Sequence, residues 1–447
     1  MPSTTRQKKP AITFVHSADW QLGKPFASVA DPAKRARVQQ ERFEAIRRIG
    51  AVVRECQAQC VLVAGDLFDS PTPTHATISA ALGAIAEIGV PVLAIPGNHD
   101  HAGPDSLWEQ PFFQRERSRL APNFHLLTTR TPHIVDLRDR GEGEASVALL
   151  PCPLLRRHEP DDPTSWLRSY DFSEIGDIPR IVIAHGSTIS FTAAGGFAHD
   201  DDDDASARAA NTIALDRLPL DEIDYIALGD FHGFSAAGAK AWYAGTPEID
   251  RFPKTGQEPG HVACVTVGRG TPPTVTAIRT GRFRWLALNI ALDAADANAG
   301  DQHEPAIHGP ASVDDSLMQA TQPRAEGEPG FDGCLADVSI TGTVSLGGRA
   351  ELDTIIESWE ARLVRLDLDD SVRIAPTLDE IHDLAARPDD PIISRVAAEL
   401  VQRLEAGGPA EELDVIRQAI FMLHALAHPQ AASASPPASI PSSVTTP

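Results

Sequence analysis

The chain has 447 residues, of which 42% are apolar and 23% are charged. This length and composition allow two or three domains with sizeable cores, and they exclude a collagen, a coiled coil and a chain that is disordered throughout. The 62 acidic and 39 basic residues give a formal net charge of −23. Taken alone, this charge argues against a polyanionic partner, because proteins that bind nucleic acids normally carry a basic surface.

Cysteine content and hydropathy indicate the compartment. The five cysteines include no CxxC pair, which fits a reducing, cytoplasmic setting. The first 20 residues contain only a short apolar run at 11–15, too short for a signal peptide or a membrane anchor. No apolar stretch approaches the roughly 20 residues that span a bilayer, so we expect no association with a membrane.

Short apolar runs alternate with helical patterns through the first half of the chain, which is typical of an α/β fold. Residues 34–55 and 74–88 are predicted to be helices, because apolar side chains recur there at helical spacing. Six β-branched runs are predicted to be buried strands. These runs are residues 12–15, 60–64, 90–95, 147–150, 181–184 and 225–228.

The pattern changes after residue 285. Residues 293–330 are rich in Ala, Asp, Gly, Pro and Gln and predict a flexible connection. A smaller α+β unit follows, with strands at 335–340 and 372–374 and a helix at 350–364. The predicted divisions are 1–285 for the first domain, 286–330 for the flexible connection, 331–390 for the small α+β domain, 391–428 for C-terminal helices that could dock a partner, and 429–447 for a disordered tail.

Polar residues follow several of the predicted strands directly, and strand ends are where open α/β sheets place their sites. Asp, Asn and His supply oxygen and nitrogen ligands for divalent metals, and a carboxylate such as Asp66 can bridge two ions. Two such ions can polarise a phosphoryl group. The polar blocks are Asp19-Trp20-Gln21, Gly65-Asp66-Leu67-Phe68-Asp69, Gly97-Asn98-His99-Asp100, His185-Gly186 and Gly229-Asp230-Phe231-His232.

These five blocks, in this order, resemble the calcineurin-like metallophosphoesterase superfamily, whose pattern runs D-x-H, GD-x-x-D/H, GNH-D/E, H and GH-x-H. The longer stretches HSADWQLG, VAGDLFDS, IPGNHD, YIALGDFHG and YAGTPE, followed by a small domain, are most similar to the SbcD-type DNA repair nucleases. The resemblance covers residues 12–252. It implies a β-sandwich flanked by helices, an α+β capping domain and an exonuclease or endonuclease activity on DNA.

The resemblance also implies a ligand set, from which this sequence departs twice. Gln21 stands where the family has the His of D-x-H, and Asp230 stands where it has the first His of GH-x-H. Both side chains are oxygen donors, and an oxygen-rich site favours Mn²⁺ or Mg²⁺ over Zn²⁺. By the family scheme, one ion would be held by Asp19, Gln21, Asp66 and His232, and the other by Asp66, Asn98, His185 and Asp230.

The remaining residues of the blocks have expected roles beside the metals. By resemblance, His99 contacts the scissile phosphate and protonates the leaving oxygen, which suits an imidazole with a near-neutral pKa. Asp69 and Asp100 are expected to orient ligands rather than to bind metal, and Asp69 could instead cap the next helix. For His16, orientation of a ligand, substitution for the missing histidine and a purely structural role all stay open.

The resemblance implies a manganese- or magnesium-dependent nuclease with two partners, DNA and an SbcC-like ATPase of the SMC family. A homodimer is left open. Two other functions also stay open: a phosphodiesterase or phosphatase acting on a nucleotide or another small molecule, and a weakly catalytic scaffold subunit for an ATPase. The scaffold is suggested by Gln21 and Asp230.

The distribution of charge changes what the net value means. Residues 1–285 contain 30 basic and 35 acidic residues, a net of −5, whereas residues 286–447 contain 9 and 27, a net of −18. The five aspartates at 200–204 alone equal the acidic excess of the first part. The charge therefore does not exclude DNA at the first domain, and we expect the C-terminal part to face solvent or a basic protein surface.

Overall fold

The chain divides into two compact units, Met1–Phe283 and Arg284–Pro447. The aspartate run at 200–204 and the tail predicted at 429–447 lie outside the residues that the structure describes. The computed structural model describes residues 11–137, 146–188, 210–253, 257–292, 309–324, 328–374, 377, 380, 383, 385–386 and 390–427.

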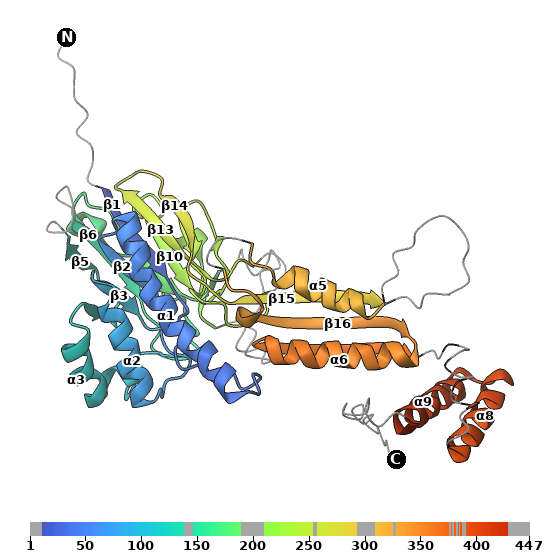
Figure 1. Ribbon diagram of the computed structural model, residues 1–447. Helices are drawn as coiled ribbons and strands as arrows, with labels where there is room; N and C mark the ends of the chain where they lie inside the picture. Colours follow the sequence, from blue (N-terminus) through green and yellow to red (C-terminus); the bar gives the residue numbers. More distant parts are fainter. Residues whose placement is uncertain are drawn as a thin grey trace, which may run out of the picture. The chain divides into compact units, whose positions relative to one another are not determined.

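Within its described residues, the first unit contains two six-stranded sheets (Figure 1). In the first sheet, β1 to β4 run parallel, and β13 and β14 join them in antiparallel pairs. In the second sheet, β6, β7, β10 and β12 run parallel, and the edge strands pair antiparallel. The parallel cores confirm the predicted α/β class.

The strands of the first sheet, in spatial order, are β14 (Thr274–Arg279), β13 (His261–Gly268), β1 (Ala11–Ser17), β2 (Cys60–Ala64), β3 (Val92–Ile95) and β4 (Phe124–Leu126). Those of the second are β11 (Ser235–Ala236), β12 (Ala241–Tyr243), β10 (Tyr225–Gly229), β7 (Arg180–His185), β6 (Ser146–Cys152) and β5 (His133–Asp136). A separate short pair consists of β8 (Ser187–Thr188) and β9 (Thr212–Ile213).

Three apolar layers hold this unit together. The face between the sheets is filled from both sides, for example by Leu62 of β2 and Ile183 of β7. The three helices α1, α2 and α3 cover the other face of the first sheet. This arrangement is the predicted sandwich flanked by helices. The covering elements are α1 (Pro32–Cys56), α2 (His75–Ala86), η1 (Leu107–Glu109) and α3 (Pro111–Leu120) on the first sheet, and η3 (Ser165–Arg168), η4 (Phe172–Ile175) and η6 (Leu215–Arg217) on the second.

Local signals explain where α1 begins and ends. The Asp31 side chain accepts hydrogen bonds from the backbone N–H groups of Ala33 and Lys34, and Pro32 occupies the first turn, where its missing N–H costs nothing. The helix ends at Gln57, which has a left-handed φ of 53°. The residues that follow lead directly into β2, so α1 is the crossover between the parallel strands β1 and β2.

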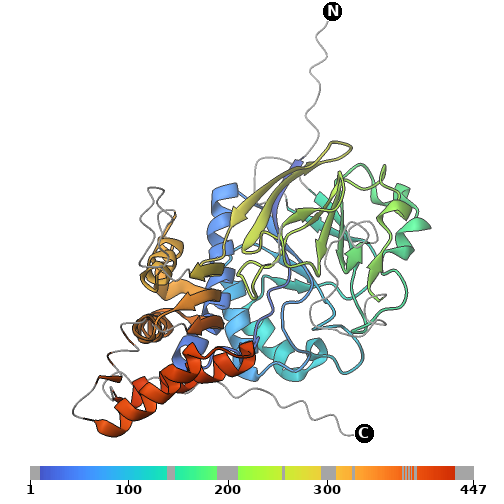
Figure 2. The same cartoon turned by 90° about the vertical axis from the view of Figure 1, so that its right-hand side faces the viewer.

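The second unit is built on a three-stranded parallel sheet with the order β15-β16-β17. The helices α5 and α6 lie side by side on one face of this sheet (Figure 2), and Trp359 Nε1 of α6 donates to Asp314 of α5 over 2.8 Å. No described helix is long and apolar enough to cross a membrane. The elements are β15 (Arg284–Leu292), α5 (Ala311–Thr321), η7 (Phe331–Gly333), β16 (Cys334–Val344), α6 (Leu346–Arg362), β17 (Arg365–Ile374), α8 (Pro391–Glu405) and α9 (Ala410–Ala427).

Two predictions for this unit differ from the structure. The interval 286–330, predicted as a flexible connection, contains most of β15 and all of α5, because β15 pairs with β16 and α5 buries Val313 and Leu317. The strand predicted at 372–374 is the end of the ten-residue β17. Its first half alternates leucine with aspartate, a half-buried strand pattern that a search for apolar runs misses.

Candidate metal centre

The carboxyl ends of the parallel strands of both sheets meet at one edge of the first unit. The backbone N–H of Asp19 donates to Gly65 over 3.1 Å, which joins the ends of β1 and β2. Gly229, at the end of β10, approaches β2 so closely that a Cβ there would lie 1.9 Å from the carbonyl oxygen of Ala64. Glycine is therefore required for the two sheets to close at this edge.

His185, at the end of β7, lies in the middle of the side chains that this edge brings together. Its Nε2 lies 3.0 Å from Asn98 Oδ1, 3.6 Å from Asp66 Oδ1 and 3.7 Å from Asp230 Oδ1. Its Nδ1 lies 4.0 Å from Asp19 Oδ1. Ligand atoms of Asp19, Asp66 and His185 all lie within 4.8 Å of one another, and the three residues are buried.

The donors and acceptors of this cluster do not balance, and the imbalance fits a metal. Nδ1 of His185 lies 2.8 Å from the Ala64 carbonyl oxygen, so Nδ1–H donates there and Nε2 is the nitrogen that can bind a metal once it has lost its proton. Gln21 Nε2 donates to Asp66 over 2.9 Å. Among the described residues, the buried Oε1 of Gln21 has no hydrogen-bond partner. A buried oxygen without a donor, beside convergent carboxylates, is what a divalent cation satisfies.

The pKa shifts within the cluster also fit a bound cation. Burial raises the pKa of Asp19 well above its usual value, and the charges of Asp66 and Asp230 raise it further against the opposing His185. Burial alone would lower the pKa of His185, but the three surrounding carboxylates raise it to about 9. The site thus concentrates negative charge away from water, and a bound cation would keep these carboxylates ionised.

Four site residues have backbone conformations that L-amino acids rarely adopt. The φ angles are 53° at Asp19, 48° at Gln21, 56° at Asp66 and 99° at Asp230. Each such residue costs about 1–3 kcal/mol, so this concentration of strain points to a functional site. The strain turns side chains from successive strand ends toward one another.

His99 lies at the rim of the cluster and is half-buried. Its backbone N–H donates to Asp66 Oδ1 over 3.0 Å, and its Nδ1 lies 2.8 Å from the carbonyl oxygen of Asp69. The carboxylate of Asp100 accepts from the backbone N–H groups of Leu67, Phe68 and Gly97 at 2.7–3.1 Å. Asp100 therefore joins the loops after β2 and β3, and the carbonyl of Asp69 orients the imidazole of His99.

Two predicted residues make hydrogen bonds outside the carboxylate cluster. His16 is fully buried in β1, and its Nδ1 lies 3.0 Å from the hydroxyl of Tyr225 in the other sheet. The side chain of His232 is held by Asp250, with Nδ1 and Oδ1 separated by 3.0 Å. His16 thus links the two sheets, and His232 is positioned from a later loop.

Two supporting residues were not identified in the sequence. Asp250 is buried, and it also binds Lys24 over 2.8 Å. Arg42 is buried on α1 and donates to the Trp20 carbonyl over 2.9 Å and to Thr246 Oγ1 over 3.2 Å. One signal could have revealed Arg42: it is a cation among apolar side chains at helical spacing. Asp250 closely follows the stretch YAGTPE, and the residues around it match no metal-ligand motif.

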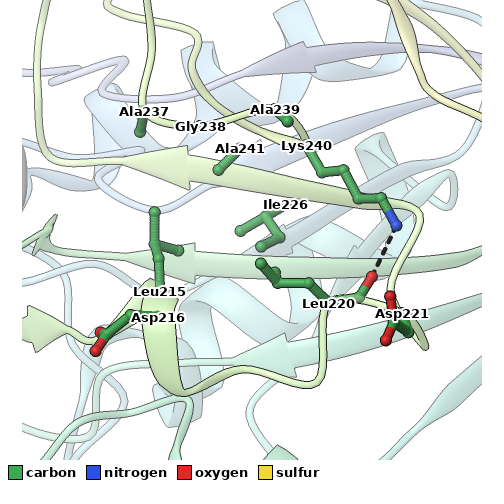
Figure 3. A pocket seen from close by; sticks show the side chains of 10 residues that line it. All are labelled: Leu215, Asp216, Leu220, Asp221, Ile226, Ala237, Gly238, Ala239, Lys240 and Ala241. Atoms are coloured by element: carbon green, nitrogen blue, oxygen red, sulfur yellow. Dashed lines mark hydrogen bonds between the residues drawn. The ribbon is translucent and has the colours of Figure 1, made fainter.

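A cavity of about 250 Å³ lies elsewhere in the same unit (Figure 3). It is mostly apolar, and Ile226, near the start of β10, contributes to it, whereas Asp230 follows the other end of that strand. The side chain of Lys240 lies along the rim of the cavity, and its Nζ donates to the Leu220 carbonyl oxygen over 2.7 Å. None of its lining residues belongs to the cluster around His185.

The chain is similar to several known phosphoesterases. The D subunit of the nuclease SbcCD from Bacillus subtilis is 26% identical over 58% of this chain and 67% of its own length. The uncharacterized metallophosphoesterase YhaO of Bacillus subtilis is 35% identical over 21% of this chain and 24% of its own length. DNA double-strand break repair protein Mre11 of Haloferax volcanii is 28% identical over 52% of this chain and 45% of its own length.

Among solved structures, a dimetal phosphatase from Danio rerio aligns with a TM-score of 0.32 and 13% identity, covering 60% of this chain and 98% of that one. The family model described as calcineurin-like phosphoesterase matches residues 12–254. This match covers more than half of the chain and includes every side chain of the cluster around His185. The chain therefore belongs to the calcineurin-like phosphoesterase family.

Proposed function

We propose that this chain is a metal-dependent phosphodiesterase of the SbcD nuclease type, which cleaves DNA in the cytoplasm during repair. The observation that carries the proposal is the buried cluster of Asp19, Asp66 and His185, whose ligand atoms all lie within 4.8 Å of one another. The similarity of the chain to an SbcCD nuclease and to an Mre11 repair protein supports DNA as the substrate.

We propose the ligand assignment that the family scheme implies. Asp66 would bridge two divalent cations, Mn²⁺ or Mg²⁺, because the donor set is rich in oxygen. When bound, the ions would polarise the phosphoryl group and supply a nucleophile from water at neutral pH. One ion would be held by Asp19, Gln21, Asp66 and His232, and the other by Asp66, Asn98, His185 and Asp230.

The chain's own residues would carry the other tasks. His99 would donate a proton from Nε2 to the leaving oxygen, because its Nδ1 faces the carbonyl of Asp69. Asp100 would hold the loop of His99 against the loop of Asp66, since it accepts hydrogen bonds from both. Burial of the cluster would keep bulk water from the carboxylates.

We also propose an SMC-family ATPase as the partner, bound through the C-terminal helices, while residues 331–390 help to position DNA. Several large apolar side chains of α8 and α9 are exposed: Ile392 at 77%, Val415 at 65% and Leu426 at 72%. Exposed apolar side chains on helices are typical of surfaces that bind another protein. The acidic balance of this region suits a basic partner surface.

The proposal is tested with the full chain in Mn²⁺, with and without the ATPase. We expect hydrolysis of linear duplex DNA, and we expect His99→Ala to lower the rate by roughly 10² to 10⁴-fold without changing metal stoichiometry. His133→Ala, at an exposed position of β5, serves as the matched control. Intact DNA under both conditions, together with hydrolysis of a mononucleotide ester, would favour a small-molecule phosphoesterase. No hydrolysis of either substrate would favour a scaffold.

A further inference from the structure

A basic turn follows β6 in the first unit. The four consecutive residues Leu155, Arg156, Arg157 and His158 are all exposed. Two of them are arginines, whose guanidinium groups match the geometry of phosphate oxygens. The proposed cleavage chemistry uses none of these residues.

This turn is attached to the segment that carries His99. The backbone N–H of Leu154 donates to Pro96 over 3.3 Å, and the N–H of Ala102 donates to Leu154 over 3.0 Å. A Cβ on Gly103 would lie only 2.9 Å from the carbonyl oxygen of Leu155. The arginines therefore follow a backbone that packs directly against residues 96–103.

The backbone of the turn is fixed from a third segment. Asn211 is buried, its Nδ2 donates to the Arg157 carbonyl over 2.9 Å, and its Oδ1 accepts from Glu159 N–H at 2.7 Å. Its own backbone N–H donates to Glu159 over 2.8 Å. A fixed backbone with exposed cationic side chains is preorganised, because binding an anion would order only the side-chain ends.

The acidic residues nearest in sequence differ in their contacts. Glu159 pairs with Arg130 at 3.4 Å and accepts from the N–H of Leu155, and Asp162 pairs with Arg168. Asp161 is exposed. Burial lowers the pKa of His101, and the nearby positive charge of Arg157 lowers it further. The turn thus adds positive charge beside the loop of the proposed catalytic histidine.

We propose that Arg156, Arg157 and His158 bind the phosphodiester backbone of a polynucleotide next to the bond that is cleaved. The inference rests on the proposed phosphodiesterase function and deepens it by specifying a nucleic acid strand over a small ester. A small ester is confined to the metal cluster, whereas a strand leaves the cluster and meets the turn that packs against residues 96–103. Contacts to phosphate give affinity and position without sequence preference.

The test is the affinity of the full chain for a fluorescent DNA duplex, measured by anisotropy at several salt concentrations. A His99→Ala background in Mn²⁺ limits cleavage, so binding is measured separately from activity. We expect the additional substitutions Arg156→Gln and Arg157→Gln to raise Kd by roughly tenfold or more. They should also flatten the slope of log K against log salt by roughly 1.8. Lysine at both positions should retain most of the slope.

Arg115→Gln with Arg119→Gln, exposed on α3, is the control of equal charge change and should leave affinity and slope near their original values. Because Arg156 and Arg157 are exposed, their replacement should move Tm by less than about 2 °C, which verifies folding. Equal affinity of the two double variants, or no DNA binding by the parent chain, overturns the inference. Loss of DNA binding in the Arg156/Arg157 variant but not in the Arg115/Arg119 variant supports the inference. This holds even where the wild type hydrolyses no DNA and the proposed function fails.

Discussion

Asp250 Oδ1 lies 3.0 Å from Nδ1 of His232, so the carboxylate fixes which imidazole nitrogen carries the proton. Burial would raise the pKa of Asp250, but His232, Lys24 and Arg251 hold it well below its usual value. The carboxylate therefore stays ionised, keeps the proton of His232 on Nδ1 and leaves Nε2 unprotonated. This is the tautomer that a metal-binding histidine requires.

Asp250→Asn tests this relationship. We expect the affinity for the Mn²⁺ ion that His232 would bind to fall by roughly 10 to 100-fold, because an amide holds the imidazole less firmly and does not raise the basicity of its Nε2. Isothermal titration calorimetry measures the change. Asp161→Asn, at an exposed position, is the control, and equal affinities in the two variants would show that Asp250 does not position His232.

Gln21→His tests the departure from the family pattern. Imidazole is a stronger and softer ligand than a neutral amide oxygen, so the substitution should strengthen metal binding and shift selectivity from Mn²⁺ toward Zn²⁺. Competitive titration with the two metals measures this. An unchanged Mn²⁺ to Zn²⁺ preference would mean that Gln21 does not contact a metal.

Arg42→Met tests how the first ligand loop is supported. The substitution keeps the volume of the aliphatic side chain but removes donors to Trp20, Thr246 and the carbonyl of Glu248. We expect the free energy of unfolding to fall by about 3 kcal/mol, because buried acceptors are left unpaired. The Tm of the first unit should fall by roughly 6–12 °C. Arg115→Met, exposed on α3, should leave Tm nearly unchanged. Equal melting of the two variants would contradict the structural role of Arg42.

Gly229→Ala tests the closure of the two sheets. The added Cβ would lie 1.9 Å from the Ala64 carbonyl oxygen and 2.8 Å from Nδ1 of His185. We therefore expect the free energy of unfolding to fall by about 1–3 kcal/mol or more, and metal binding to weaken. Gly83→Ala is the control, because nothing lies within 4 Å of its Cβ. On α2 this alanine should raise Tm slightly. Calorimetry of both variants gives the comparison, and two similar melting temperatures would refute the steric account.

That the site residues lie close together could be predicted from the sequence, because each of them closely follows or ends a strand in the chain. Asp66 and His185 each end or follow an apolar strand run, and parallel strands place their carboxyl ends at one edge. Asp250 and Arg42 could not be found this way. Lys24 and Asp250 are 226 residues apart, and Arg42 meets Thr246 across 204 residues. Such pairs exist only after both sheets have assembled.

The second unit shows the same limit at the level of elements. Helix α5 is short, and the sequence on either side of it gives no helical signal. The helix is stabilised by burial of Val313 and Leu317 against other elements rather than by its own composition. Strand β17 carries aspartates along one side, which lowers its apparent β propensity. In both, tertiary packing outweighs local preference.

The most direct test of the metal centre is the number of Mn²⁺ ions that the full chain binds at equilibrium, together with the resulting rise in Tm. We expect two ions per chain, and saturation at about 100 times Kd should stabilise the fold by about 2.7 kcal/mol for each ion bound. Asp66→Asn should remove most of this binding and stabilisation, because Asp66 contacts both Gln21 and His185. A chain that binds no Mn²⁺, or whose Mn²⁺ binding survives Asp66→Asn unchanged, would contradict the account.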